Sequence, residues 1–451
     1  MPIRSAVLML ISAVVLPIPA PAADIHVSPT GGPAGSGSIS DPIDLATAFS
    51  GAGVAPGDII FLHGGIYQGN YTSHLTGNQA APIIVRPFQD EWPTIDGVGS
   101  SETTLSIHGS WAEYHEFEIT NSEPNRWGGR PSGLYVVGAN LTLANLVIHD
   151  LGNNGFWSPA ENLEVTGCLI YFNGYDDTDR GHGHGVYTQN QTGTKLFSDN
   201  VIFGGYSFGI HAYTEGGHIE GFSFTGNTWF DAGVTSTVSG HKDDCLVGGL
   251  QPASRIVLQE NNGWARSYTD RSVRLGYAVP NGDVILVDNY LVGGLNFAQP
   301  WSSITMTGNM VYGTVSGIDP ASYPGNSFPS SRPTGVRIDL RPNPHDRGRA
   351  LITIYNWDEL DTVEVDPSPV LRPGETYVVR DPQNYFGPPA ATGVWSGGSI
   401  SVPMDLTAVS PVVGSPADPF IHTPVEFGVY VLHTIGTIFI DGFESGDTSA
   451  W

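Results

Sequence analysis

The residues best suited to chemistry lie in two glycine-flanked stretches of the chain. The first reads Tyr175-Asp-Asp-Thr-Asp-Arg-Gly-His-Gly-His184, and the second reads Gly240-His-Lys-Asp-Asp244. Imidazole, phenol and amine groups can transfer protons, and basic side chains can also neutralise a carboxylate. β-Elimination from a uronic acid requires these groups: a base for the C5 proton, an acid for the leaving oxygen and a cation beside the carboxylate.

These stretches and the strands that follow them predict a role for each group. We expect His184 or His211 to be the base, with Tyr187 as its acid or base partner. Lys242 or Arg180 is expected to neutralise charge on the substrate. The residues expected to bind substrate around this centre are Tyr135, Trp157, Gln189, Tyr213, Asn153, Asn154, His182, His241 and Asp243.

Two other kinds of function remain open from these residues. Glycoside hydrolysis needs two carboxyl groups about 5 to 10 Å apart. Asp243 or Asp244 could pair with Glu161 or Asp177, but the spacing forces no pairing, so a lyase is favoured. The other alternative is a non-catalytic β-helix that binds a glycan or a metal. Separately, the glycines around His182 and His184 could simply form a tight turn with solvated imidazoles.

A metal site is a further possibility, and no cofactor is certain. His182 and His184 are two residues apart and face the same side of an extended segment, and His211 lies one coil further on. Three imidazoles suit zinc or copper. The acidic residues Asp176, Asp177 and Asp179 instead suit calcium, which prefers carboxylate oxygens.

Short strands at irregular intervals must position these groups. They begin at Gly133-Leu-Tyr-Val-Val, Gly155-Phe-Trp-Ser-Pro, Gly185-Val-Tyr-Thr-Gln, Gly209-Ile-His-Ala-Tyr and Cys245-Leu-Val, which are 22, 30, 24 and 36 residues apart. A coil of about 22 residues with loop insertions explains this spacing, whereas a propeller blade would repeat at about 40. The pattern predicts a single-stranded right-handed parallel β-helix.

Strand alternation then predicts which side chains share the outer face. The residue after each start points into the core and the next one points outward. The first outward column reads Tyr135, Trp157, Tyr187, His211 and Val247, and the second reads Val137, Pro159, Gln189 and Tyr213. Exposed rings in a row are costly unless something covers them, so we expect a groove in which sugar rings stack on aromatic faces. The alternative is that loops or the C-terminal domain bury this column.

A recurring asparagine near the end of each second strand predicts an internal ladder of side-chain amides. The ladder is expected to contain Asn145, Asn200, Asn227, Asn262, Asn289 and Asn309, with Cys168 in one coil. Each amide would bond the one about 4.8 Å above it. These residues therefore receive a structural role.

The opening IHVSPTGG…DPIDLATAF…APGDIIFLHGGIYQG contains one short amphipathic helix, at about 41–49, suited to capping an open strand edge. This opening resembles those of secreted pectate-lyase-like and chondroitinase-B-like β-helix proteins, and the resemblance implies the fold and a possible calcium ion. The segment GHGHGVYTQNQTGTK is similar to a stretch of secreted bacterial β-helix proteins.

The rest of the chain completes the predicted organisation. Residues 1–22 resemble a signal peptide, 23–317 form the β-helix, 318–334 a linker, 335–435 a β-sandwich and 436–451 a tail, all in an all-β chain. The sandwich is expected to pack on the helix rather than to bind carbohydrate. We expect a monomer that is secreted, periplasmic or on the cell surface.

The composition limits the partners. The formal net charge of −26 argues against nucleic acid and against an anionic membrane, and a polyanionic substrate would need a local basic patch or a bridging cation. No segment beyond the signal peptide is apolar for long enough to span a membrane. Cys168 and Cys245 fall at different positions of the repeat, so no disulfide is expected.

Overall fold

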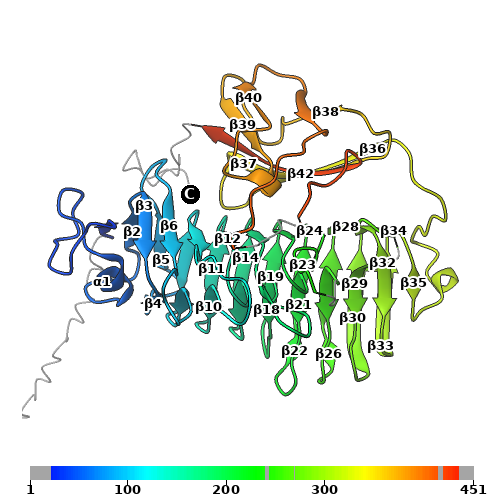
Figure 1. Ribbon diagram of the computed structural model, residues 1–451, viewed down its shortest axis with the longest axis horizontal. Coiled ribbons are helices and arrows are strands. Elements are labelled where there is room, and N and C mark those ends of the chain that lie inside the picture. The colour runs from blue at the N-terminus through cyan, green and yellow to red at the C-terminus, as the bar shows by residue number, and fades with distance from the viewer. Residues whose placement is uncertain (1–21, 239–242, 269, 415–419, 436–451) are drawn as a thin grey trace, which may run out of the picture.

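The computed structural model describes residues 22–238, 243–268, 270–414 and 420–435 (Figure 1). It contains a right-handed parallel β-helix followed by an antiparallel β domain, which confirms the predicted fold class. The proposed tail, and the proposed signal peptide apart from Ala22, lie outside these residues. No helix in the described part of the chain has the length and apolar character needed to cross a bilayer.

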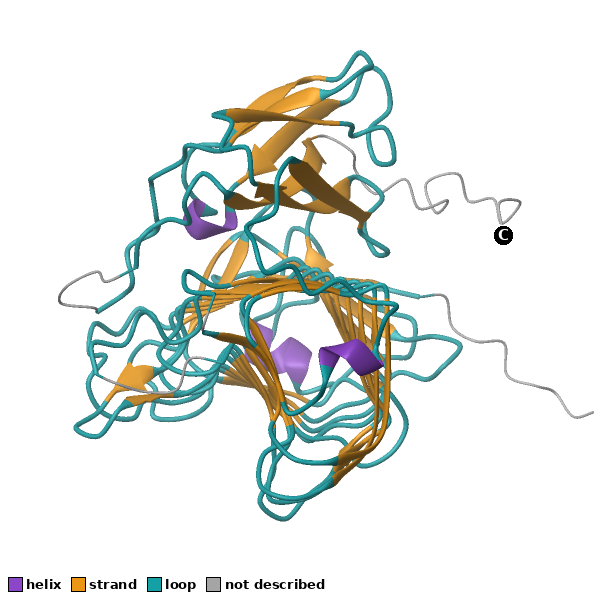
Figure 2. Cartoon of the chain, turned by 90° about the vertical axis from the view of Figure 1, so that its right-hand side faces the viewer, coloured by secondary structure: helices purple, strands orange, loops and turns teal. Residues whose placement is uncertain are grey.

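Three long parallel sheets form the walls of the β-helix, and Figure 2 shows them around a common core. The first sheet contains β1 (Asp24–Val27), β2 (Ile59–Leu62), β5 (Ile83–Pro87), β8 (Ala112–His115), β11 (Leu141–Ala144), β14 (Leu163–Thr166), β19 (Lys195–Ser198), β23 (Phe222–Thr225), β27 (Ile256–Gln259), β30 (Asn281–Val287) and β33 (Trp301–Thr307). The second contains β4 (Tyr71–Ser73), β7 (Leu105–Ile107), β10 (Leu134–Val136), β13 (Phe156–Ser158), β18 (Val186–Thr188), β21 (Ile210–Ala212), β25 (Cys245–Val247), β29 (Arg271–Leu275), β32 (Gly294–Phe297) and β35 (Val315–Ser316). The third contains β3 (Gly65–Gln68), β6 (Pro93–Asp96), β9 (Glu118–Thr120), β12 (Val147–His149), β15 (Leu169–Tyr171), β20 (Val201–Phe203), β24 (Thr228–Phe230), β28 (Asn262–Trp264), β31 (Tyr290–Val292) and β34 (Met310–Tyr312).

The N-terminal end of the stack is covered by a helix shorter than expected. Helix α1 spans Leu45–Phe49, because Asp44 caps it by accepting a hydrogen bond from the Thr47 amide at 2.7 Å. Leu45, Ala48 and Phe49 are buried in the apolar core of the coils. The helix therefore closes the end of the core, as the sequence predicted.

The asparagine ladder is present, but two of its predicted members are wrong. Its amides run from Asn200 through Asn227, Asn261, Asn289 and Asn309 to Asn326, with Nδ2 to Oδ1 distances of 2.7–3.0 Å. The Cys168 amide donates to Asn200 Oδ1 at the start of the ladder. Asn262 and Asn145 instead point toward the C-terminal domain, where they bond Asp339 and Asn343.

The register also corrects one residue of the outward column. His211 pairs with Leu246, whereas Val247 pairs with the buried Ala212 and faces the core. The error arises because Asp244, rather than a glycine, precedes the fifth strand. Cys168 and Cys245 are both buried and unbonded, which confirms the expectation of no disulfide.

The last coil continues beyond residue 317, since Asn326 joins the ladder and Ser327 pairs with Met310. It includes the 3-10 turn Pro320–Ser322.

The C-terminal domain has two sheets. The five-stranded sheet contains β36 (Val336–Pro342), β37 (Arg349–Asn356), β42 (Phe427–Ile435), β39 (Thr376–Arg380) and β40 (Ala391–Val394). The two-stranded sheet contains β38 (Thr362–Val365) and β41 (Ile400–Pro403), and a 3-10 turn lies at Pro382–Asn384.

Figure 2 shows this domain packed on one side of the β-helix, and the strand residues that it contacts belong to the third sheet. Leu351, Tyr355 and Phe427 of the domain form one apolar cluster with Phe203 and Trp264 of the coils. The outer face of the second sheet is therefore left uncovered by the domain.

Candidate functional site

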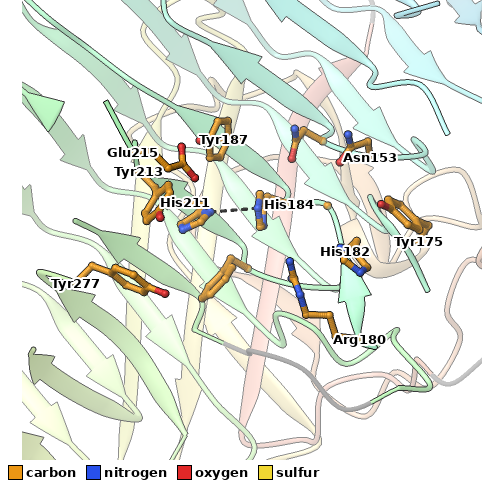
Figure 3. Close-up of a pocket in the computed structure, with 13 residues that line it drawn as sticks. Asn153, Tyr175, Arg180, His182, His184, Tyr187, His211, Tyr213, Glu215 and Tyr277 are labelled. Carbon is orange, nitrogen blue, oxygen red and sulfur yellow. Dashed lines mark hydrogen bonds between the residues drawn. The ribbon is translucent and has the colours of Figure 1, made fainter. Parts of the chain in front are cut away.

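A pocket of about 450 Å³ opens on the outer face of the second sheet (Figure 3). Its walls are loops next to β13, β18, β21 and β29, and its floor is formed by outward side chains of β18 and β21. The residues lining it are Asn153, Asn154, Tyr175, Arg180, His182, Gly183, His184, Tyr187, Phe208, His211, Tyr213, Glu215 and Tyr277. Most of the residues predicted for catalysis and binding thus lie together.

Two histidines meet at the centre of the pocket. Tyr187 and His211 are paired neighbours in β18 and β21, and His184 lies in the turn that enters β18. His184 Nε2 is 3.1 Å from His211 Nδ1, within hydrogen-bonding distance (Figure 3). Strand register and one short turn therefore bring these two imidazoles together.

His184 is held in its neutral form. Burial lowers the pKa of its imidazole to about 3, and the charges of Arg180 and His182 add to this effect. Its Nδ1 is buried and has no hydrogen-bond partner. In the tautomer in which the neutral His184 accepts at Nε2, His211 donates from Nδ1 and its own Nε2 carries the lone pair.

Tyr187 and Tyr213 flank this pair. The Tyr187 ring centroid lies 5.7 Å from that of His184 and 5.6 Å from that of His211, and the Tyr213 ring stacks on His211 at 4.6 Å. Burial raises the pKa of both phenols, and the Glu215 carboxylate raises it further. Both phenols therefore keep their protons and can donate them.

A short hairpin forms one wall of the pocket. Its strands are β16 (Tyr175–Asp176) and β17 (Gly181–His182), and the Tyr175 and His182 rings stack at 5.0 Å. Asp176 points away from the pocket and accepts hydrogen bonds from Ser236 Oγ at 2.5 Å and Thr237 Oγ1 at 2.7 Å. This buried carboxylate fixes the hairpin that carries Arg180 and His182.

The candidate metal ligands do not converge. Asp176 is engaged by Ser236 and Thr237, and Asp179 Oδ1 lies 2.7 Å from His182 Nε2. His184 and His211 bond each other. Within the described residues no group of three or more His, Cys, Asp or Glu side chains is arranged to hold a metal ion. The donors present therefore do not fit a calcium, zinc or copper centre.

Three predicted binding residues have other surroundings. Tyr135 and Trp157 stack face to face at 4.1 Å with planes 9° apart, so each ring covers one face of the other. Sugar stacking on these two rings stays a prediction, with one face of each ring already occupied by the other. Gln189 hydrogen-bonds Tyr187 rather than lining the pocket.

Residues from the second predicted stretch are only partly described. His241 and Lys242 lie outside the described residues. Asp243 is buried and forms ion pairs with Arg271 and Arg274, so it does not line the pocket. Asp244 is buried and accepts a hydrogen bond from the Ala232 amide. The carboxylates considered for hydrolysis thus fall outside the pocket, and Glu215 is the one carboxylate among its described lining residues.

Sequence reasoning missed Phe208, Glu215 and Tyr277, and gave Tyr175 no role. Glu215 is two residues after Tyr213 in the same loop, so the outward column carried a signal for it. Tyr277 follows β29, two coils beyond His211, and its approach depends on a loop whose direction the repeat does not fix. Its ring meets that of Tyr213 edge-on at 5.4 Å.

Comparison with known proteins agrees with this architecture. A family model described as a Pel9A-like, right-handed β-helix region matches residues 25–238, a range that includes the histidine pair. The matched residues form a parallel β-helix of the pectate-lyase-like kind. A search of curated proteins found no match to the sequence.

Solved structures show the same β-helix at low sequence identity. A rhamnogalacturonan lyase is 16% identical with a TM-score of 0.51, over 68% of this chain and 87% of that one. The pectate lyase Pel9A is also 16% identical, with a TM-score of 0.47 over 68% and 79% of the two chains. An alginate lyase from Paenibacillus sp. strain FPU-7 has 16% identity and a TM-score of 0.44, over 68% and 99%. At this identity the likeness concerns the fold.

Proposed function

We propose that this β-helix protein is an exported lyase that cleaves an acidic polysaccharide by β-elimination in the pocket of the second sheet. The observation that carries the proposal is the 3.1 Å contact between a neutral His184 and His211, with protonated tyrosines beside it. A family model of the Pel9A-like kind and the β-helix shared with a rhamnogalacturonan lyase support the substrate class.

His211 is the base in this mechanism. Its Nε2 takes the C5 proton of the uronic acid, and the electron pair of the C–H bond forms the C4–C5 double bond. The C4–O bond breaks, and the leaving oxygen takes a proton. His184 accepts the Nδ1 hydrogen bond of His211 and so stabilises the imidazolium that forms, as an orienting group does beside a catalytic histidine.

Tyr187 supplies the proton to the leaving oxygen. Its phenol has a raised pKa, so it is protonated before the reaction, and its ring lies beside both histidines. Arg180, which is about two-fifths exposed at the rim, neutralises the substrate carboxylate, with the amides of Asn153 and Asn154 as further donors. Charge neutralisation stabilises the enolate-like transition state.

Hydrolysis by two carboxyl groups fits the pocket less well. That mechanism requires an acid and a second carboxylate on opposite sides of the scissile bond. Glu215 has no carboxylate partner among the described lining residues. The described lining residues therefore suit β-elimination better than hydrolysis.

The test is a turnover screen on acidic polysaccharides (polygalacturonate, rhamnogalacturonan and alginate) and neutral ones (dextran and arabinan). The proposal predicts new chain ends with at least one acidic polymer and none with the neutral ones, and loss of turnover in His211→Gln. Binding without turnover across the panel, with folded protein, would instead indicate a non-catalytic glycan-binding β-helix.

A further inference from the structure

Basic side chains are scarce in this protein, yet three arginines lie along the outer face of the second sheet. The chain has 18 Lys and Arg residues against 44 Asp and Glu residues. Arg180 lines the pocket, while Arg271 and Arg274 belong to β29 further along the same sheet. A local group of cations in a strongly acidic protein is the feature that an anionic substrate would require.

Arg274 lies at a defined distance from the histidine pair. His211 pairs with Leu246, and Leu246 pairs with Arg274, so the three residues occupy one outward column. Two strand spacings separate His211 from Arg274, about 10 Å along the coil axis. Leu246 between them is buried and uncharged.

Packed rings connect the two positions. Tyr213 stacks on His211 at 4.6 Å, Tyr277 meets Tyr213 at 5.4 Å, and the Arg274 guanidinium lies 4.8 Å from the Tyr277 ring centroid. Tyr213 and Tyr277 both line the pocket. Arg274 therefore lies beside the end of the pocket that these two rings form.

Asp243 orients the arginines without neutralising both. Its Oδ1 is 2.5 Å from Arg271 Nε, and its Oδ2 is 3.8 Å from Arg274 Nη1. The Asp243 side chain is 2% exposed, whereas Arg271 is 43% and Arg274 is 18% exposed. Arg274 Nε is buried without a hydrogen bond. One carboxylate thus faces two guanidinium groups: Arg271 hydrogen-bonds to it, whereas Arg274 lies 3.8 Å from it.

We propose that Arg271 and Arg274 form a second anionic subsite, which binds the carboxylate of a uronic acid two sugar units from the one beside His211. This inference rests on the proposed function. A pyranose unit advances a glycan by roughly one strand spacing, so two units span the distance from His211 to Arg274. The preferred substrate then carries carboxylates on every unit or on alternate units, and an isolated uronic acid in a neutral chain is a poor one.

The experiment compares the double variant Arg271→Gln/Arg274→Gln with the wild type on the polyuronate that the wild type cleaves. We expect KM for the polymer to rise about tenfold or more, because charge-assisted hydrogen bonds to a carboxylate are lost, with kcat changed less than about threefold. On a disaccharide, which is too short to reach the subsite, both proteins should behave alike. Arg255→Gln, which removes a half-exposed arginine paired with Glu220, is the matched control and should leave KM unchanged.

An unchanged polymer KM in the double variant would overturn the subsite, and so would an equal loss on the disaccharide. Failure of the wild type to cleave any polyuronate would overturn the proposed function instead. In that case affinity electrophoresis in gels that contain polygalacturonate or alginate tests whether the subsite binds acidic glycans. Retardation of the wild type and of Arg255→Gln, but not of the double variant, supports the subsite. Equal mobility of wild type and double variant contradicts it.

Discussion

His184 Nε2 and His211 Nδ1 lie 3.1 Å apart, and the proposed mechanism assigns the base to only one of these two residues. Burial keeps His184 neutral, with a pKa of about 3, so it is a poor proton acceptor at ordinary pH. His211 shares the outward column with Tyr187 and has His184 as its hydrogen-bond partner. The sequence predicted either histidine as the base; the geometry favours His211, with His184 as a positioning residue.

Substitution of the two histidines should therefore have unequal effects. His211→Gln removes the base and is expected to lower kcat by at least about 10²-fold. His184→Gln keeps a neutral acceptor beside His211 and is expected to cost about tenfold or less, with an unchanged shape of the pH profile, because His184 does not titrate in that range. Steady-state rates between pH 5 and 9 measure both effects. A larger loss in His184→Gln than in His211→Gln would reverse the assignment.

Tyr187→Phe tests the acid. Removal of the phenol should lower kcat by about 10²-fold while the ring still packs beside the histidines. Tyr213→Phe is the matched control, since its ring also packs against His211 and also lines the pocket. We expect less than about fivefold loss there. If Tyr187→Phe loses less than threefold, Tyr187 is not part of the mechanism.

The asparagine ladder should carry a measurable part of the stability. Asn227 donates to Phe197 O at 2.8 Å and to Asn261 Oδ1, and its own Oδ1 accepts from the amide and the side chain of Asn200. Asn227→Ala leaves several of these buried groups unpaired and is expected to lower the free energy of unfolding by about 2–4 kcal/mol. Asn78→Ala, in an exposed turn, should cost less than about 1 kcal/mol. Urea unfolding measures both, and equal losses would contradict the structural role of the ladder.

The ladder also shows how far the sequence could be interpreted. Asn200, Asn227, Asn289 and Asn309 were predicted, because each follows the end of a strand. The adjacent Asn261 and Asn262 both satisfy that rule. Only the backbone distinguishes them. From Asn200 to Asn309 each ladder residue follows one with positive φ, here Glu260 at 54°, which turns the next side chain inward. The conformation of the residue before each asparagine therefore decides which of the two amides joins the ladder.

Long-range contacts account for most of what the sequence could not predict in the site. Alternation placed Tyr187 and His211 on one face, and the turn placed His184 beside them. The pairing of Asp243 with Arg271 and Arg274 occurs in a coil with an insertion, and the sequence repeat does not predict where such an insertion runs. The engagement of Asp176 by Ser236 and Thr237 spans 60 residues and has no repeat to reveal it. Asp176, one of the acidic residues considered as possible calcium ligands, therefore fixes a loop.

A buried histidine outside the site should make stability depend on pH. Burial lowers the pKa of His149, but hydrogen bonds to Asp150 and Glu118, each at 2.8 Å, outweigh this and raise it to about 9 from 6.5. The stabilisation is complete below pH 6.5 and is lost as the pH rises through about 9. We expect the free energy of unfolding to fall by about 1–3 kcal/mol over this window, and His149→Gln to flatten that fall. An identical slope in the variant would assign the dependence to other groups.

The most direct test of the proposed elimination is the ratio of two products of the wild-type protein on one acidic polysaccharide. Elimination creates one conjugated, ultraviolet-absorbing double bond for every new reducing end, since both come from the same broken C4–O bond. We predict a ratio of one throughout the reaction, and loss of both signals together in His211→Gln. Reducing ends that accumulate without ultraviolet absorbance would mean hydrolysis and would contradict the assignment of His211 as the base that removes the C5 proton.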